Sequence, residues 1–253
     1  MSPPKVDTGV APRLATFRLV KRYGFVTALN DVSVQFLPGL TGIVGDNAAG
    51  KSTLLKVLSG VVVPEKGTVL VDGKAQLFAS ARAARAAGVE SLYQDLALIE
   101  TMSIAENIFL GRERTRRLMG LRIVDRNKML QESDEILKKV RINMPPSRVG
   151  VKQLSGGQRQ AVAIARAMRF AARVVLLDEP TAALGPKETA AFLSIIRDMA
   201  GSGETVVMVG HNLPQMLELA DHLMVMRAGR VVAKPPPKQT SLRELTEFMV
   251  GSA

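Results

Sequence analysis

The sequence contains no cysteine and no tryptophan, and aromatic residues make up only 4% of its 253 residues. Without cysteine the chain can form no disulfide, thiolate metal site or cysteine nucleophile, which fits a reducing compartment. With so few aromatic rings it offers little on which single-stranded bases could stack. Disulfide-framed secreted domains and thiol chemistry are therefore excluded.

Long hydrophobic runs are also missing. No stretch reaches the roughly 18 apolar residues of a membrane-spanning helix, and the N-terminus lacks the apolar core of a signal peptide. Hydrophobic residues nevertheless account for 47% of the sequence and charged residues for 23%, enough to bury the core of one large domain. We therefore expect a cytosolic protein whose attachment to a membrane would be peripheral.

Acidic residues are in deficit. The chain has 34 Lys and Arg against 23 Asp and Glu, a net charge of +11, and residues 82–173 alone hold 18 basic and 9 acidic residues. A cluster lies at Arg112, Arg114, Arg116 and Arg117. Such an excess favours an acidic partner, such as nucleic acid, a nucleotide or a membrane surface, and a merely solvated basic face is the alternative.

Hydrophobic periodicity divides the chain into three regions. Apolar runs bounded by Gly and Pro predict strands at 16–20, 31–36, 40–44, 68–71, 174–177 and 205–209. Helical spacing predicts helices at 52–58, 103–110, 125–140, 155–168, 186–200 and 214–220, and a terminal helix to about 250 that is capped by Ser241 and Glu244. A basic loop is expected over 112–122 and a hairpin turn at Ala228-Gly229.

Strands that alternate with helices predict an α/β fold with a mainly parallel sheet, and the middle third predicts an inserted helical subdomain. Within a single domain of residues 1–253, we expect a strand-rich core at about 14–78 and 171–234 and the helical subdomain at about 79–170. Residues 235–253 should form a proline-rich linker and a C-terminal helix.

Residues 45–53 form a GxxxxGKS pattern that follows a predicted strand and opens a predicted helix. In such a loop, backbone N–H groups can hold phosphate oxygens, Lys51 can reach the β- and γ-phosphates, and the Ser52 hydroxyl can bind Mg²⁺. A chance glycine-rich turn is the alternative, which the flanking elements disfavour. The candidate residues are Gly45, Asp46, Asn47, Ala48, Ala49, Gly50, Lys51, Ser52 and Thr53.

Two adjacent carboxylates, Asp178 and Glu179, end the apolar strand at 174–177. Such a strand delivers its last side chains to the carboxyl edge of the sheet, where nucleotides bind in open α/β folds. Asp178 suits a Mg²⁺ ligand, and Glu179, on the other side of the strand, could act as general base toward a water. Solvated acids at a strand end are the alternative.

Between these motifs lies LSGGQ, residues 154–158, which leads into a predicted helix. Ser155 as N-cap, followed by Gly156 and Gly157, would expose backbone donors to an anion. By itself this pattern is weak, and a structural turn is the better interpretation.

The order of phosphate loop, LSGGQ and LLDEP (176–180) resembles the ATP-binding subunits of ABC transporters, over nearly the whole chain. The resemblance implies a P-loop NTPase fold with an N-terminal antiparallel β-subdomain. It also implies that Ser155, Gly156, Gly157 and Gln158 bind the γ-phosphate of ATP held by a second subunit. One loop and one LSGGQ per chain then imply two composite MgATP sites in a homodimer.

Three further residues match positions of this family. Tyr23 resembles the aromatic residue that stacks on adenine, Gln94 the glutamine that contacts Mg²⁺ or the water, and His211 the switch histidine near the γ-phosphate. A half-buried strand tyrosine, a surface glutamine and a structural histidine are the respective alternatives. The expected catalytic residues are thus Glu179, His211 and Gln94, and the expected metal ligands Ser52, Gln94 and Asp178.

Three positions depart from the family pattern. Ala48 stands where glycine is usual, which matters only if the residue has positive φ. Gly210 replaces the usual Ser or Thr before the switch histidine, and Gly185 replaces an aspartate that makes a contact across the dimer.

Several segments, among them SIAENIFLGRE (103–113) and PTAALGP (180–186), resemble ATPases of bacterial monosaccharide importers of the ribose, xylose and fructose type. The resemblance implies ATP and Mg²⁺ as cofactors, and a membrane permease and, indirectly, a solute-binding protein as partners. The expected location is the cytoplasmic face of the inner membrane, with no nucleic acid partner. An importer of another solute, a small-molecule kinase and a soluble non-transport ABC ATPase are the alternatives.

Overall fold

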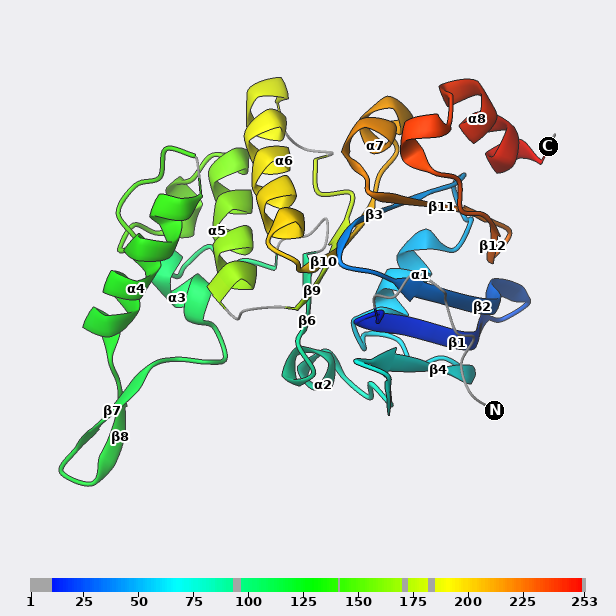
Figure 1. Ribbon diagram of the computed structural model, residues 1–253. Coiled ribbons are helices and arrows are strands. Elements are labelled where there is room, and N and C mark those ends of the chain that lie inside the picture. The colour runs from blue at the N-terminus through cyan, green and yellow to red at the C-terminus, as the bar shows by residue number, and fades with distance from the viewer. Residues whose placement is uncertain (1–10, 93–96, 141, 170–172, 182–184, 252–253) are drawn as a thin grey trace. The chain divides into compact units, whose positions relative to one another are not determined.

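The computed structural model describes residues 11–92, 97–140, 142–169, 173–181 and 185–251. The chain forms two compact units (Figure 1). The first unit comprises Met1–Ser91, Ala172–Pro180 and Ile196–Ala253, and the second comprises Leu92–Ala171 and Thr181–Ile195.

A six-stranded sheet forms the centre of the first unit. Its order is β12 (Arg230–Ala233), β11 (His222–Arg227), β3 (Gly39–Val44), β10 (Thr205–Val209), β9 (Val174–Asp178) and β6 (Val89–Leu92). The pairs β11–β3, β3–β10 and β10–β9 are parallel, and β12 is antiparallel to β11. Every residue of β3 and β10 is buried, as near-continuous apolar runs require of central parallel strands.

An antiparallel sheet lies in the same unit. Its order is β2 (Val26–Phe36), β1 (Leu14–Tyr23), β4 (Lys66–Val71) and β5 (Lys74–Gln76). Helix α1 (Lys51–Leu58) contributes four buried apolar side chains to a core cluster that also contains residues of both sheets. The phosphate-loop helix is thereby held by packing against both sheets.

The remaining helices of the first unit are α2 (Ala81–Ala86), α7 (Leu213–Leu219), the 3₁₀ turn η2 (Pro237–Gln239) and α8 (Leu242–Val250). The predicted capping box is confirmed: Ser241 Oγ accepts from the Glu244 amide at 3.2 Å, and Glu244 accepts from the Ser241 amide at 2.7 Å. The first unit extends to residue 91 rather than ending near 78, because Ala84 and Val89 belong to its core cluster.

The second unit contains α3 (Ile104–Phe109), α4 (Arg126–Lys139), the 3₁₀ turn η1 (Val151–Gln153), α5 (Gly156–Arg169) and the beginning of α6 (Pro186–Gly201). Asn107 is fully buried and fastens the segment before α3, since its side chain accepts from the Ile99 amide at 2.7 Å and donates to the Ile99 carbonyl at 3.0 Å. The expectation of a loop over 112–122 is wrong, because this segment forms most of a hairpin of β7 (Thr115–Leu118) and β8 (Leu121–Val124).

The fold class predicted from the sequence is confirmed: the protein is α/β, with a mostly parallel sheet, an antiparallel sheet near the N-terminus and a helical unit. Among the residues that the structure describes, no helix combines the length and the apolar character needed to cross a bilayer.

Candidate active site

The loop between β3 and α1 has a backbone that only glycine allows at its two ends. Gly45 has φ 153° and Gly50 has φ 99°. A Cβ at Gly45 would overlap the Met226 carbonyl oxygen, and one at Gly50 would overlap the Ala28 carbonyl oxygen. The two glycines of the motif are therefore required by the close approach of neighbouring backbone as well as by φ.

Lys51, the first residue of α1, folds back over this loop. Its Nζ donates to the carbonyl oxygens of Gly45 at 2.7 Å and Asp46 at 2.8 Å, and its side chain is buried. Burial lowers the pKa of the Lys51 ammonium, and the charges of Glu179, Asp46 and Asp178 oppose that shift. An ammonium in this position would gain from a negatively charged ligand such as a phosphate.

Ser52 and Asp178 meet at the carboxyl edge of the parallel sheet. Ser52 Oγ donates to Asp178 Oδ1 at 3.2 Å, so that the second residue of α1 is joined to the last residue of β9. Burial raises the pKa of the Asp178 carboxyl, against the hydrogen bond from Ser52, which lowers it. A cation beside Asp178 would offset the free-energy cost of burying this carboxylate.

Glu179 and His211 form the second polar contact of the site. Nε2 of His211 lies 2.5 Å from Oε1 of Glu179, and the Glu179 amide donates to the Val209 carbonyl at 3.2 Å. Glu179 has φ 49°, a left-handed conformation that is unfavourable for a non-glycine residue. The end of β9 thus turns the Glu179 carboxylate toward the histidine that follows β10.

Lys51, Ser52, Glu179 and His211 line one cavity of about 330 Å³ in the first unit. It is lined by Val26 and Ala28 of β2, by residues 47–53, and by Glu179 and His211. Sequence reasoning missed Val26 and Ala28, which are ordinary apolar residues without a motif. Tyr23 pairs with Val26 in the β1–β2 register, and its side chain is half-exposed, with Lys21 Nζ 5.5 Å from the centroid of its ring.

The turn between β11 and β12 supports the loop, which sequence reasoning also missed. The Gly229 amide donates to the Ala49 carbonyl at 3.0 Å, and the Gly229 carbonyl accepts from Asn30 at 2.8 Å. The predicted hairpin at Ala228-Gly229 is confirmed, with both residues at positive φ. Its contact with the loop joins residues far apart in sequence, so no local pattern could reveal it.

Ala48 has φ 64°, so the condition under which its replacement of glycine matters is met. A Cβ in the left-handed region costs roughly 1–2 kcal/mol. This cost lies within the loop that would hold phosphate.

We expect Ala48→Gly to raise the free energy of unfolding by about 0.5–1 kcal/mol. Glycine removes the cost of the left-handed conformation, and this gain exceeds the free energy by which the more flexible glycine stabilises the unfolded chain. Thermal unfolding should show a midpoint higher by roughly 1–4 °C. Ala49→Gly is the matched control, since Ala49 is buried and is not among the positive-φ residues, and it should destabilise the protein. Equal destabilisation by both substitutions would contradict the conclusion that the positive φ of Ala48 is unfavourable.

The LSGGQ segment lies in the second unit, where it begins α5. Ser155 Oγ accepts from the Gln158 amide at 3.3 Å, and Gln158 Oε1 accepts from the Ser155 amide at 3.1 Å. This reciprocal capping confirms Ser155 as the N-cap and fixes the first turn, which contains Gly156 and Gly157. Its role toward a nucleotide stays a prediction.

Gln94 lies outside the residues that the structure describes, and so do residues 182–184. Gly210 is described: a Cβ there would overlap the methyl group of Met216, a buried side chain of α7. A serine at 210 would therefore require Met216 to move. Gly185 is exposed, and its carbonyl accepts from the Thr189 amide at 2.9 Å at the start of α6.

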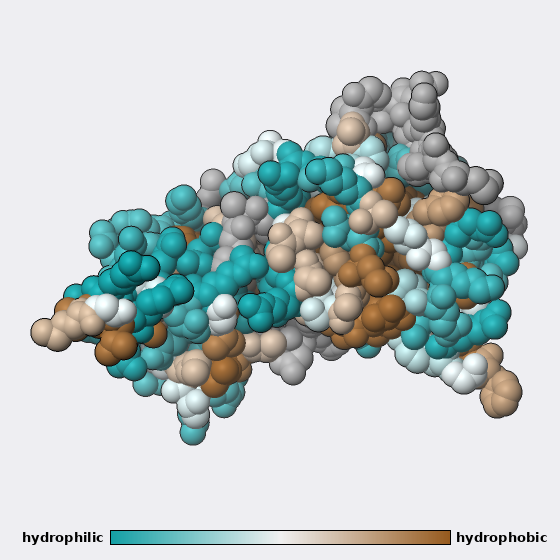
Figure 2. Space-filling view, turned by 90° about the horizontal axis from the view of Figure 1, so that it is seen from below, coloured by the Kyte–Doolittle hydropathy of each residue, from teal (hydrophilic) through white to brown (hydrophobic). Residues whose placement is uncertain are grey.

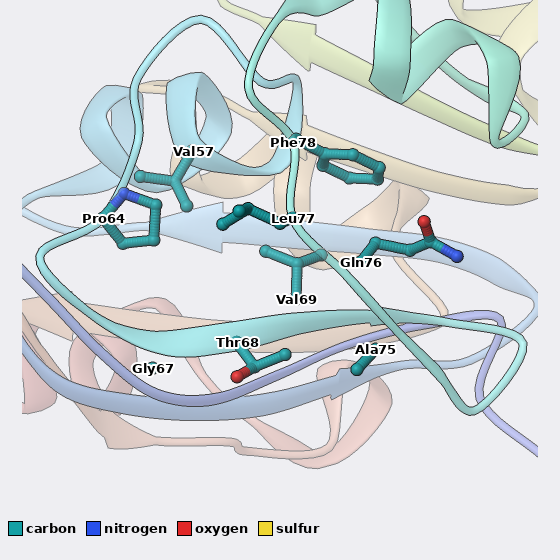
Figure 3. Close-up of a pocket in the computed structure, with 9 residues that line it drawn as sticks. All are labelled: Val57, Pro64, Gly67, Thr68, Val69, Ala75, Gln76, Leu77 and Phe78. Carbon is teal, nitrogen blue, oxygen red and sulfur yellow. The ribbon is translucent and has the colours of Figure 1, made fainter.

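A second cavity in the first unit, of about 230 Å³, lies beside β4 and β5 (Figure 3). Val57 of α1, Pro64, Val69 and Leu77 surround it, and none of its nine lining residues is titratable. It offers no titratable group for acid–base chemistry.

Comparison with known proteins gives consistent relatives. The ABC transporter family model matches residues 29–182. The chain is 42% identical to the fructose import ATP-binding protein FrcA of Rhizobium meliloti, over 95% of each chain. It is 41% identical to the xylose/arabinose import ATP-binding protein XylG of Sulfolobus acidocaldarius, over 92% of each chain.

Solved structures share the fold. An ATP-binding cassette of an ABC transporter in its ADP conformation superposes with a TM-score of 0.76, at 24% identity and 94% coverage of both chains. A dimeric cassette in a post-hydrolysis state with ADP and Pi superposes with a TM-score of 0.75, at 22% identity, over 90% of this chain and 100% of the other.

Proposed function

The chain belongs to the ABC transporter family, among its ATP-binding subunits, and from this premise we propose that it hydrolyses MgATP to drive import of a monosaccharide through a membrane permease. The observation that carries the proposal is the single cavity lined by the phosphate loop, Glu179 and His211, with Asp178 bonded to Ser52 at the same sheet edge.

The residues present fit a nucleotide with Mg²⁺. Ser52 and Asp178 offer a hydroxyl and a carboxylate oxygen, the hard ligands that Mg²⁺ prefers, and Mg²⁺ commonly completes its shell with substrate phosphates and water. The described residues hold no group of three or more His, Asp or Glu side chains around one point, and such a shell requires none. When bound, Mg²⁺ would neutralise charge on the phosphate oxygens.

Hydrolysis would depend on positioned charge more than on covalent chemistry. Lys51 Nζ would exchange its carbonyl partners for the β- and γ-phosphates. The Glu179 carboxylate would accept a proton from the attacking water, and His211, held against Glu179 Oε1, would orient that carboxylate. The exposed ring of Tyr23 would stack on adenine.

We propose that two copies act together. The chain carries one phosphate loop and one LSGGQ, and in a homodimer the α5 N-terminus of one copy would complete the site of the other. Residues Ser155 to Gln158 would then bind the γ-phosphate in trans. The dimeric cassette with ADP and Pi supports this arrangement as a relative of the same fold.

The names of FrcA and XylG support a sugar as cargo, since both full-length matches are import ATP-binding proteins for monosaccharides. The subunit would lie peripherally at the cytoplasmic face of the membrane. A permease would be its direct partner and a solute-binding protein an indirect one, with no nucleic acid involved. Gln94 would contact Mg²⁺ or the attacking water.

Affinity purification tests this function. From mildly solubilised membranes, the tagged chain should recover an integral permease, and the reconstituted complex should take up a monosaccharide only with MgATP. Recovery of soluble proteins or nucleic acid alone would favour a non-transport ATPase. Uptake of a different solute would support the function of an importer and contradict the proposal that its cargo is a monosaccharide.

A further inference from the structure

The β7–β8 hairpin of the second unit extends away from the helices beside it (Figure 1). Every residue of both strands is exposed except Ile123, which is partly exposed. The exposed residues at its tip are apolar: Leu118, Met119 and Leu121 are 52%, 97% and 71% exposed. A two-stranded hairpin that displays apolar side chains to water on both sides is unfavourable unless something covers it.

Arginine side chains lie directly behind this apolar tip. Arg117 is paired with Arg122 across the strands, and Arg116 projects from the opposite face because successive side chains alternate. Like charges directly opposite each other destabilise a hairpin, and residues 115–124 contain no acidic residue to offset them. The pair would be favourable beside an anionic partner.

The base of the hairpin is fastened while its tip is free. Arg114 forms a 2.9 Å ion pair with Glu132 of α4, and the Asp125 amide donates to the Arg114 carbonyl at 2.8 Å. Asp125 in turn caps α4 by accepting from the Lys128 amide at 3.1 Å. The hairpin is therefore held at its base to the start of α4.

We infer that the tip of this hairpin inserts into the headgroup region of a bilayer that contains anionic lipids. At roughly 3.3 Å per residue, Met119 leads the Arg117–Arg122 pair by about 7 Å. That distance matches the roughly 5–10 Å by which interfacial segments bury apolar side chains while their basic residues stay among the headgroups. This inference rests on the proposed peripheral membrane location, and it identifies the tip of the hairpin as the part of the protein that contacts lipid.

The distribution of charge favours lipid over a protein or nucleic acid partner. Arginines on both faces surround the hairpin, whereas docking to a protein would use one face. A headgroup layer meets all sides of an inserted tip. The apolar residues gather at the turn, and Figure 2 shows tan and brown residues beside teal ones at the end of the molecule where the hairpin lies. The hairpin has no aromatic side chain for base stacking.

Co-sedimentation with protein-free vesicles tests the inference. The full chain should bind phosphatidylcholine vesicles that contain phosphatidylglycerol, and bind pure phosphatidylcholine weakly. Arg117→Gln with Arg122→Gln should weaken binding to the anionic vesicles about 25-fold, equivalent to about 2 kcal/mol. Lys138→Gln with Lys139→Gln, exposed on α4 of the same unit, removes the same charge and should change binding much less.

The apolar tip is tested separately. Leu118→Ser, Met119→Ser and Leu121→Ser together should weaken binding at least 10-fold, whereas serine at the exposed residues Val61, Val63 and Leu77 of the first unit should not. Because the chain has no cysteine, Met119→Cys can carry a single polarity-sensitive dye. Its emission should shift to the blue with anionic vesicles, and that of a Leu77→Cys control should not.

The inference would be overturned by a failure to bind protein-free anionic vesicles, or by binding that hairpin substitutions leave unchanged. Binding only to vesicles that contain the permease would assign the hairpin to a protein contact and also reject it. The ATPase rate of each variant should match that of the parent chain without lipid. A loss of the proposed ATPase function would therefore appear in those rates and not in vesicle binding.

Discussion

Replacing Glu179 with glutamine is expected to leave ATP binding intact and to slow hydrolysis by about 10²–10⁴-fold, the usual contribution of a general base. The amide keeps the shape of the side chain and can still contact His211 Nε2. It cannot accept the proton of the attacking water. Binding and chemistry should therefore separate in this one variant.

Nucleotide affinity and single-turnover rates would measure the two effects. Because hydrolysis would no longer reopen the proposed dimer, size-exclusion chromatography in MgATP should also show Glu179→Gln as a dimer. Glu218→Gln is the matched control, since Glu218 is exposed and pairs only loosely with Arg197 at 3.5 Å. A Glu179→Gln rate close to that of the parent protein would remove the general-base assignment.

The parts of the fold that the sequence predicts are those with a local signature. The buried strands β3, β9 and β10 are continuous apolar runs, and the N-caps Ser103, Ser155 and Ser241 each stand three residues before a Glu or Gln. The phosphate loop was predictable because GxxxxGKS specifies both its glycine conformations and its helix. These features depend on interactions between residues that are close together in the sequence, so a local sequence pattern is enough to predict them.

The parts that escaped prediction depend on distant contacts or on misleading composition. The bond from Gly229 to Ala49 joins two loops that no local pattern relates. The β7–β8 segment lacks the regular alternation of a half-buried strand, because its arginines and apolar residues occupy both faces, so it reads as a basic loop. The carbonyl partners of Lys51 also follow from how the chain folds back, which the motif alone does not specify.

Two residues that line the candidate active site have an unfavourable backbone conformation. Ala48 and Glu179 both have positive φ, and both line the same cavity. Unfavourable conformations of this kind cost about 1–3 kcal/mol each and persist where the surrounding structure fixes them. At Glu179 this conformation directs the carboxylate toward His211. At Ala48 no comparable contact with a described residue offsets the cost, so of these two residues only Ala48 is expected to stabilise the protein when it is replaced by glycine.

Lys51→Ala should weaken ATP binding by about 10- to 100-fold, because charge-assisted hydrogen bonds to phosphate contribute about 1.5–3 kcal/mol. Hydrolysis should fall further, since the same ammonium would stabilise charge that develops on the γ-phosphate. Isothermal titration with a non-hydrolysable ATP analogue and steady-state ATPase assays would measure the two losses. Lys56→Ala is the control on the same helix, as Lys56 is exposed.

The stability of this variant separates a lost contact from a damaged fold. Burial lowers the pKa of Lys51, so the folded protein without ligand bears a free-energy cost for that charge. The cost is constant below the lowered pKa and diminishes as pH rises through it toward the pKa of lysine in the unfolded chain. Removing the ammonium removes this cost along with two hydrogen bonds to carbonyls. Lys51→Met, which keeps the alkyl stem, should therefore unfold within about 1 kcal/mol of the parent protein while losing nucleotide binding. A Lys51→Met variant that unfolds much more easily would instead show that the hydrogen bonds of Lys51 to the loop carbonyls stabilise the folded protein.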